Sequence, residues 1–216
     1  LLGEFAHRTM QPMMAVWPIY VSLSESLWRP VKLPGKGPRG LAVAGSKVYV
    51  AQYFSDTVAE VDLRSDGEPS IRTIALGPPP ELTAERRGEL LFHDATICYQ
   101  KWQSCASCHP DGRADGLAWD LMNDGSGNSK STKSMLLSHR TPPSMAEGVR
   151  DSAEKAVRSG LDNILFTNRS EAEAAAIDAY LDSLRPVPSP HLVDGRLSPA
   201  AERGRQLFHS ARVACH

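Results

Sequence analysis

The chain has almost no net charge, because 24 Lys and Arg residues stand against 25 Asp and Glu residues, a formal charge of −1. Without a basic excess, the composition does not point to nucleic acid or to an anionic membrane as a partner. The longest mainly apolar run, residues 12–23 (PMMAVWPIYVSL), contains Pro18 and is too short to span a bilayer. It also lacks the charged start and small-residue cleavage site of a signal peptide. We therefore expect no nucleic-acid partner and no membrane span.

Cysteine is scarce, and the 4 residues present are too few for a fold held together by disulfides. Two of them form the motif CASCH, in which Cys105 and Cys108 are followed directly by His109. C-x-x-C-H is the attachment motif for c-type haem. Each cysteine can add to one vinyl group, and the adjacent histidine can reach the iron from the proximal side. The motif predicts one haem c on this chain, and Cys98 is expected to be a buried free thiol.

Two other uses of the motif fit the sequence less well. A thioredoxin-like C-x-x-C requires a βαβ setting, which the surrounding pattern does not provide. A structural zinc site requires a second ligand pair at comparable spacing, and the sequence has none. Catalytic residues stay unassigned, because haem attachment alone does not say whether the iron reacts or only carries electrons.

Short runs rich in β-branched and aromatic residues predict four strands, at residues 40–45, 47–53, 57–63 and 70–76. Turn formers such as Gly45-Ser46 separate them. Four short strands within about 40 residues are typical of one propeller blade, and residues 38–63 resemble the blades of YVTN-type bacterial β-propellers. The alternative is a small β-meander, because a propeller needs several blades to close. Residues 1–36 show no clear periodicity.

The proline-rich stretch LGPPPEL, residues 76–82, predicts a linker and a domain boundary. Thr83 is the predicted N-cap of a helix that runs to about residue 95. Residues 144–160 predict one or two helices ending at Gly160. Ser170 and Glu173 form a predicted capping box for a further helix. The apolar residues of that last helix recur at the spacing of one buried stripe, Ile177, Tyr180, Leu181 and Leu184.

The sixth ligand decides what a haem iron does, since a tight His or Met gives an electron carrier and an open position admits peroxide or oxygen. His139 and Met145 are the favoured candidates, because they lie in a proline-bearing loop (LLSHRTPPSM) that can cover a haem face. The sequence does not choose between them. Weaker candidates are Met122, Met135 and His93. Trp102 and Trp119 are candidates to pack on the porphyrin, with a place in the core as the alternative.

The second half of the chain contains an internal repeat, with one copy near its start and the other near its end. Residues 87–95 (RGELLFHDA) and 203–211 (RGRQLFHSA) align without a gap and share 6 of 9 residues. The first copy leads to CASCH, and the second leads to Cys215 and His216. If Cys215 is the first cysteine of another C-x-x-C-H, a second haem begins there in a longer protein. The first residue is Leu1, which predicts that an upstream region has been removed. The alternative is a natural terminus with a chance repeat.

The helices on either side of CASCH resemble the first and last helices of the cytochrome c fold. In that fold a glycine lets the two helices cross closely, and aromatic side chains fill the crossing. Gly88, Phe92, Tyr180 and Leu181 match these roles. Independently of any family, a glycine on an apolar helix face is best explained as a point of close contact.

The order of the motifs resembles that of the bacterial di-haem cytochrome c peroxidase family. A haem motif (SCASCHPDGRADGLAWD) is followed by a proline-bearing loop, a terminal helix and a second motif. Residues 80–216 carry this resemblance, and a YVTN-like propeller segment precedes them. It implies that Cys105 and Cys108 attach the haem, that His109 is the proximal ligand, and that a second haem relays electrons to this one. The chain departs from the family at residues 144–150, where SMAEGVR replaces an FWDGR-like segment and its aromatic and acidic pair.

These patterns predict an α+β protein, with a mainly α, cytochrome c-like haem domain behind a small antiparallel β segment that resembles a propeller blade. The expected parts are residues 1–78 (propeller-like), 79–190 (haem domain) and 191–216 (the start of a second haem domain). Because haem c is attached outside the cytoplasm, the expected location is periplasmic or exported.

The predicted function is that of the N-terminal haem domain of a di-haem peroxidase-like enzyme, which reduces peroxide or oxidises a substrate together with a second haem. The expected partners are a redox protein that gives or accepts electrons and a small oxidant such as peroxide. The full-length protein is favoured as an oxidoreductase, whereas this fragment alone can serve for electron transfer only. The alternatives are an electron-transfer cytochrome c without turnover and a propeller binding module with an accessory haem.

Overall fold

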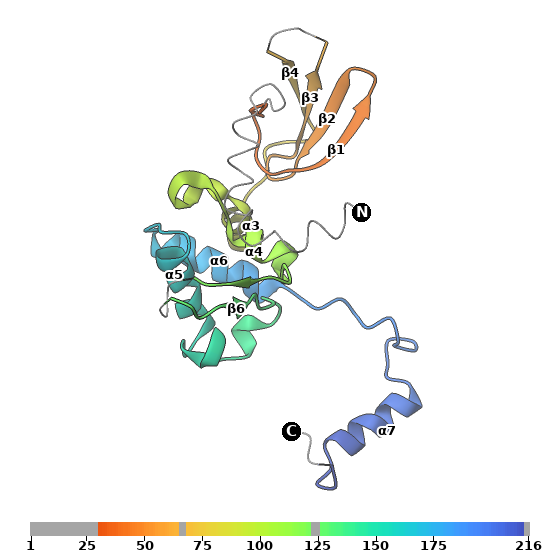
Figure 1. The fold of residues 1–216 in the computed structure, drawn as a ribbon. Helices are drawn as coiled ribbons and strands as arrows, with labels where there is room; N and C mark the ends of the chain where they lie inside the picture. The colour runs from red at the N-terminus through yellow and green to blue at the C-terminus, as the bar shows by residue number, and fades with distance from the viewer. Residues whose placement is uncertain (1–29, 65–67, 122–125, 214–216) are drawn as a thin grey trace, which may run out of the picture. The chain divides into compact units, whose positions relative to one another are not determined.

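The computed structural model describes residues 30–64, 68–121 and 126–213, and Figure 1 shows their helices and strands. The apolar run 12–23, Met122, Cys215 and His216 lie outside these residues. The chain divides into two compact units, Leu1–Glu81 and Leu82–His216. The described part of the first unit contains an antiparallel sheet, and that of the second contains helices and a short strand pair. The predicted α+β class is confirmed at this level.

The sheet is a meander with the strand order β1-β2-β3-β4, in which every neighbouring pair is antiparallel. Its strands are β1 (Pro38–Ala44), β2 (Lys47–Gln52), β3 (Thr57–Asp62) and β4 (Ser70–Ala75). The four predicted strands are therefore confirmed. β3 is the most buried of them, with Ala59 and Val61 in the core. A propeller is not shown, because the described residues of the first unit form this one meander of four strands.

Glu60 on β3 forms ion pairs with both neighbouring strands. Lys47 Nζ on β2 donates to Glu60 Oε1 at 2.9 Å, and Arg72 on β4 donates to Oε2 at 3.1 Å. These hydrogen bonds lower the pKa of Glu60 to about 2, and the bond from Lys47 has the largest effect. Because a slip of one residue turns a side chain to the opposite face of a sheet, the ion pairs favour the observed pairing of Glu60 with Arg72.

The second unit holds the remaining described elements. Its helices are α3 (Ala84–His93), α4 (Cys105–Cys108), α5 (Ala153–Asn163), α6 (Glu171–Ser183) and α7 (Pro199–Phe208). β5 (Ala118–Trp119) pairs with β6 (Lys130–Ser131). Short 3-10 turns are η1 (Ala95–Ile97), η2 (Tyr99–Lys101), η3 (Pro110–Gly112), η4 (Ser138–Arg140) and η5 (Ala146–Gly148). The predicted helix starts are confirmed at Thr83, which caps α3, and at the Ser170–Glu173 capping box of α6.

α3 and α6 cross at Gly88, as the sequence predicts. A Cβ atom at this position would lie 1.9 Å from the carbonyl oxygen of Ala176 and 2.9 Å from Cβ of Tyr180. No side chain fits in that space, so glycine is required for this approach. Beside the crossing, the rings of Phe92 and Tyr180 lie 5.3 Å apart. Ile177, Tyr180 and Leu181 of the predicted stripe are buried in the core cluster, whereas Leu184 follows the end of α6 and is half-buried against that cluster.

The helix expected within residues 144–160 begins later and ends later than predicted. Ser144 and Arg150 pair across a short loop, through bonds of 2.7 Å and 3.2 Å between their backbone groups. α5 therefore begins at Ala153, and the hydroxyl of Ser152 caps it by accepting from the amide of Lys155. It also continues past Gly160, because Leu161 is buried in the core and stabilises the extra turn.

α7 forms the second copy of the repeat, but its surroundings differ from those of α3. Ser198 caps its start. None of its residues is buried, and a Cβ added at Gly204 would meet nothing within 4 Å. The repeat therefore specifies a helix in both places, and the close packing is present at the first copy.

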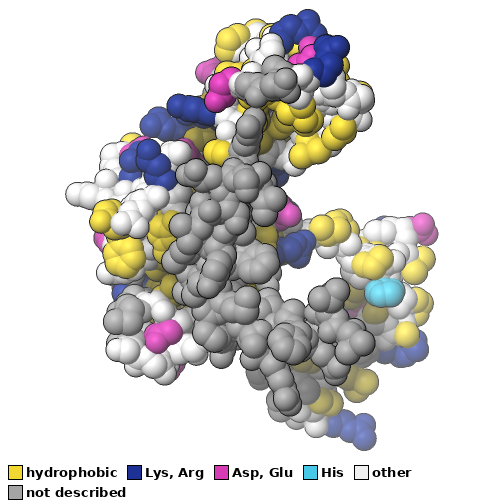
Figure 2. All heavy atoms as spheres, turned by 45° about the horizontal axis from the view of Figure 1, so that its top comes forward, with side chains coloured by type: hydrophobic (Ala, Val, Ile, Leu, Met, Phe, Trp, Pro, Cys, Tyr) yellow, Lys and Arg dark blue, Asp and Glu magenta, His cyan; other side chains and the backbone are white. Residues whose placement is uncertain are grey.

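The described surface carries mixed charge. In Figure 2, basic side chains are scattered among acidic and apolar ones, in keeping with a formal charge of −1. Within the described residues, no helix combines the length and the hydropathy needed to cross a membrane.

Candidate haem-binding site

The CASCH motif forms one short turn of helix, which places its two cysteines on the same side. Ser104 and Ser107 form a capping box at the start of α4. The amide of His109 donates to the carbonyl of Cys105 at 2.9 Å, which closes the turn. Residues spaced i, i+3 on a helix are neighbours, so Cys105 and Cys108 present their thiols together. Both are free cysteines.

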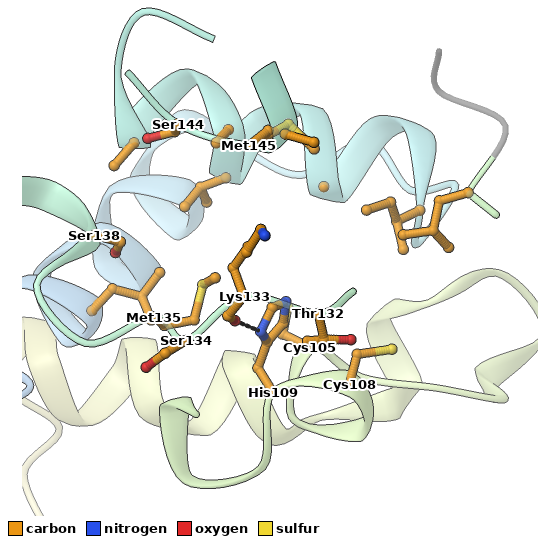
Figure 3. A pocket seen from close by; sticks show the side chains of 18 of the residues that line it. Cys105, Cys108, His109, Thr132, Lys133, Ser134, Met135, Ser138, Ser144 and Met145 are labelled. Atoms are coloured by element: carbon orange, nitrogen blue, oxygen red, sulfur yellow. Dashed lines mark hydrogen bonds between the residues drawn. The ribbon is translucent and has the colours of Figure 1, made fainter. Parts of the chain in front are cut away.

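His109 is oriented by the backbone of a segment far along the chain. Its Nδ1 lies 2.8 Å from the carbonyl oxygen of Lys133 and 3.3 Å from that of Arg113. Because both partners are acceptors, Nδ1 carries the proton and Nε2 keeps its lone pair. Figure 3 shows the ring standing in the pocket with Nδ1 bonded to Lys133. Metal-binding histidines commonly donate their second ring nitrogen to a carbonyl in this way.

Further backbone bonds hold the segment that contains Lys133 against the motif. The amide of Met135 donates to the carbonyl of Gly112 at 2.8 Å, and the amide of Asp115 donates to that of Cys108 at 3.1 Å. Gly112 has φ +69°, and a Cβ there would lie 2.5 Å from a methyl of Leu184. Glycine is therefore needed for the turn that follows His109.

A pocket of about 410 Å³ opens in front of the motif, which lies within the usual size range of cofactor sites, about 300–1,000 Å³. Cys105, Cys108 and His109 line it, facing walls contributed by α3, α5 and α6. Those walls are mainly apolar, with Phe92, Val157, Leu161, Ile177 and Leu181 among the lining residues. An apolar wall suits a flat macrocycle and excludes water from a metal.

Burial keeps the two motif cysteines protonated. It raises the pKa of the Cys105 thiol to about 12, with the neighbouring Cys108 and Cys98 adding to the rise. Burial also raises the pKa of Cys108, with the carboxylate of Asp115 as a second cause. Both residues are therefore neutral thiols at pH 7. A thiol, rather than a thiolate, resists oxidation to a disulfide, so this setting preserves both cysteines for another bond.

These donors fit a c-type haem. Two thiols share one side of a turn, a histidine presents an unprotonated Nε2, and an apolar pocket lies in front of them. The zinc alternative gains no support, because the described residues contain no group of three His, Cys, Asp or Glu side chains that is arranged to hold a metal ion. The site thus has the features of a haem c-binding redox protein.

The structure separates the other residues singled out from the sequence. Trp119 lines the pocket, and its Nε1 donates to Asp115 Oδ2 at 2.8 Å. Trp102 is 65% exposed and is not among the lining residues. Cys98 is buried and free, as predicted.

Among the weaker ligand candidates, Met135 lines the pocket. His93 bonds through Nδ1 to the carbonyl of Glu89, on its own helix.

The two favoured ligand candidates both line the pocket, but they differ in what holds them. His139 Nε2 bonds to Asp178 Oδ1 at 3.0 Å, and its Nδ1 lies 3.3 Å from the hydroxyl of Ser138. Met145 has a backbone φ of 67° and ψ of 179°, an uncommon conformation for a residue with a side chain.

Sequence reasoning did not find two groups that organise the site. One is the carbonyl of Lys133, which holds His109. Backbone carbonyls leave no residue-type signal in a sequence. The other is Asp178, which bonds to His139 and also pairs with Arg158 of α5. The sequence did contain a signal for Asp178, because an acidic residue directly follows the buried Ile177 on α6.

Comparisons with known proteins give one consistent relative. No protein-family model matches the chain. It is 34% identical over 143 residues to hydrazine synthase subunit gamma of Kuenenia stuttgartiensis, a match that covers 60% of this chain and 40% of that protein. The solved structure of K. stuttgartiensis hydrazine synthase under 20 bar of xenon matches with a TM-score of 0.57 and 27% identity. That match covers 69% of this chain and 59% of the solved chain. The chain thus spans less than two thirds of the length of either relative.

The predicted membership of the di-haem cytochrome c peroxidase family, with its fusion to a YVTN-type propeller, is wrong. The similarity that is found is to hydrazine synthase subunit gamma, and no family model matches. The structure agrees at residues 144–150, where a tight loop closed by Ser144 and Arg150 replaces the family's aromatic and acidic pair. The prediction relied on the order of motif, loop and helix. That order follows from the need to enclose a haem, so it does not distinguish one haem protein from another.

Proposed function

We propose that this chain binds one haem c through Cys105 and Cys108 and serves as an electron-transferring part of a multi-subunit oxidoreductase. One observation carries the proposal. His109 is held by the carbonyl of Lys133 with its Nε2 unprotonated, at the edge of an apolar pocket that both motif cysteines also line. Haem, when bound, supplies a one-electron couple. The chain's own residues attach it, orient its proximal ligand and exclude water.

The helices around the pocket support a cytochrome c-like arrangement for this unit. α3 precedes the motif, α6 follows it, and the two cross at Gly88 with Phe92 and Ile177 facing the pocket from the crossing. Such a crossing fixes one wall of the pocket rigidly. A rigid wall suits electron transfer, because a haem that moves little between its oxidised and reduced states has a low reorganisation energy.

The similarity to hydrazine synthase subunit gamma supports a place in a larger assembly. We propose that the partners are other subunits of an enzyme of the hydrazine synthase type, to or from which this chain passes electrons. Because haem c is attached outside the cytoplasm, we also propose an exported location.

We propose further that α7 begins a second unit of the same kind. This rests on the repeat, which gives α7 the glycine of α3 in the same register, Gly204 for Gly88. A second haem at Cys215 belongs to this proposal, as do the three parts 1–78, 79–190 and 191–216.

Reversible reduction of the haem-loaded chain tests the proposed function. The chain is produced in a periplasm with the haem-attachment machinery, and its visible spectrum is recorded during a redox titration. We expect c-type bands that appear and disappear reversibly in a single one-electron step. His109→Ala should alter the spectrum and the midpoint, whereas His191→Ala, at an exposed position, should leave both unchanged. A His109→Ala spectrum identical to that of the parent would show that His109 is not the iron ligand.

A further inference from the structure

The loop that runs from Ser138 to Arg150 carries both favoured candidates for the sixth ligand, and the structure distinguishes them. His139 is tied down at both ring nitrogens. Nε2 donates to Asp178 Oδ1 at 3.0 Å, and Nδ1 faces the hydroxyl of Ser138 at 3.3 Å. Its side chain is only 6% exposed. Neither nitrogen has a lone pair to offer a metal unless a buried hydrogen bond is broken, and an unpaired buried polar group is unfavourable.

Asp178 is itself held in place, which makes the bond to His139 a fixed anchor. Its second oxygen accepts from Arg158 of α5, and Arg158 also pairs with Glu171 at the start of α6. Arg140, next to His139, reaches Asp182 one turn further along α6 at 3.4 Å. The start of the loop is thus bound to α6 by the hydrogen bond from His139 to Asp178 and by the ion pair of Arg140 with Asp182, and His139 belongs to this anchor.

Met145 has none of these ties, and its side chain reaches the pocket. In Figure 3, Ser144 and Met145 lie on one side of the pocket and His109 lies on the other. The thioether sulfur of methionine is a soft ligand that binds iron without losing a proton. Met145 is therefore placed and chemically suited to face the side of a haem that His109 does not occupy.

The backbone holds Met145 in a strained conformation. Its φ of 67° with ψ of 179° is a backbone conformation that residues with a side chain rarely adopt. Ser144 and Arg150, on either side of Met145 in the chain, pair with each other and hold this conformation in place. The guanidinium of Arg150 is bonded to the buried hydroxyl of Ser159 on α5, at 3.2 Å. Strain of this kind persists only where its surroundings impose it, and it is concentrated at ligand sites.

Lys133 and Met135 are tied through their backbones to the segment that carries His109. The carbonyl of Lys133 bonds to His109, and the amide of Met135 bonds to Gly112 in the turn that follows His109. Figure 3 shows Lys133, Ser134 and Met135 on one segment beside the histidine. Met135 therefore enters the pocket from the segment that holds His109, whereas Met145 enters from the other side.

We propose that Met145 Sγ is the sixth ligand of the iron and that His139 is a positioning residue, which fixes the loop through Asp178. This rests on the proposed function, since it requires haem c with His109 as the proximal ligand. A His–Met pair gives low-spin iron with a raised potential and closes the site to small molecules. The chain then acts as an electron carrier at this haem.

The test uses the haem-loaded full chain and its ferric absorption spectrum. A thioether ligand gives ferric haem a weak band at the red end of the visible range. We expect that band in the parent, and we expect Met145→Ala to abolish it, produce high-spin iron and lower the midpoint potential. Met135→Leu should keep the band. A parent without the band, or a Met145→Ala spectrum equal to that of the parent, would overturn the assignment.

Variants of His139 separate positioning from ligation. His139→Ala should weaken the red band and raise the affinity for added imidazole, because the loop loses its anchor. His139→Gln retains a donor for Asp178 and should restore the band. If His139→Ala instead gives high-spin iron that His139→Gln does not rescue, His139 is the ligand and the proposal fails. Failure of the proposed function looks different, because the parent then holds no covalent haem at all.

Discussion

α3 and α7 share six of nine residues in their matching segments, yet one is packed and the other is exposed. In α3, Gly88 meets the backbone of Ala176 and Leu91 is 6% exposed. In α7, Gly204 meets nothing within 4 Å and Leu207 is 53% exposed. The pair shows that the motif encodes a helix with an apolar face and a point of close approach, and that tight packing also requires the crossing helix α6.

Truncating the matched leucines should give the largest difference between the two copies. Leu91→Ala removes a buried side chain that does not line the pocket, and it should cost about 2–5 kcal/mol of unfolding free energy. Leu207→Ala changes an exposed side chain and should stay within about 0.5 kcal/mol of the parent. Chemical denaturation followed by circular dichroism measures both. Equal losses would mean that α7 is packed as α3 is.

Adding one methyl group at the matched glycines should produce opposite signs. Gly88→Ala places a Cβ against the carbonyl of Ala176, so the helices must separate at a cost of about 1–3 kcal/mol. Gly204→Ala has open space and should raise the stability of α7 by up to about 1 kcal/mol through helix propensity. Thermal unfolding of the two variants gives the sign directly. Destabilisation by Gly204→Ala would indicate a close neighbour at α7.

Removing the helix caps should give the smallest loss of stability, and the loss should affect a different part of the protein for each helix. Thr83→Ala and Ser198→Ala each delete a hydroxyl that accepts from a first-turn amide, worth about 1 kcal/mol. At α3 the loss should lower the unfolding midpoint of the whole helical unit, because α3 is part of its core. At α7 it should only speed amide hydrogen exchange within residues 199–208. A lowered unit midpoint in Ser198→Ala would contradict this difference.

The parts of the molecule that local chemistry encodes were predicted well from the sequence. Thr83 and the Ser170–Glu173 box start helices through contacts within one turn, and the alternating β-branched runs give the four strands. Gly88 was also identified, because an apolar face with one glycine implies a close approach. The start of α5 was missed, since it depends on Ser144 pairing with Arg150 across a loop.

The site was only half predictable for the same reason. The proposed attachment motif is contiguous, so Cys105, Cys108 and His109 could be singled out from sequence alone, and their role in holding haem stays a prediction. The choice between His139 and Met145 depends on Asp178, which is distant in the chain, and on a backbone conformation. Neither is visible in a local pattern. The family assignment failed because the order of elements around a haem motif reflects the enclosing of a haem, whichever protein it serves.

The account depends most directly on a covalent bond between haem and this motif. Tryptic peptides of the chain, produced with the haem-attachment machinery and extracted with acidified acetone, should be weighed by mass spectrometry. We predict that the peptide containing Cys105 and Cys108 carries the mass of one haem, that Cys98→Ser leaves this unchanged, and that Cys105→Ser with Cys108→Ser abolishes it. Haem that is removed completely by the extraction, leaving the parent peptide at its unmodified mass, would contradict the account.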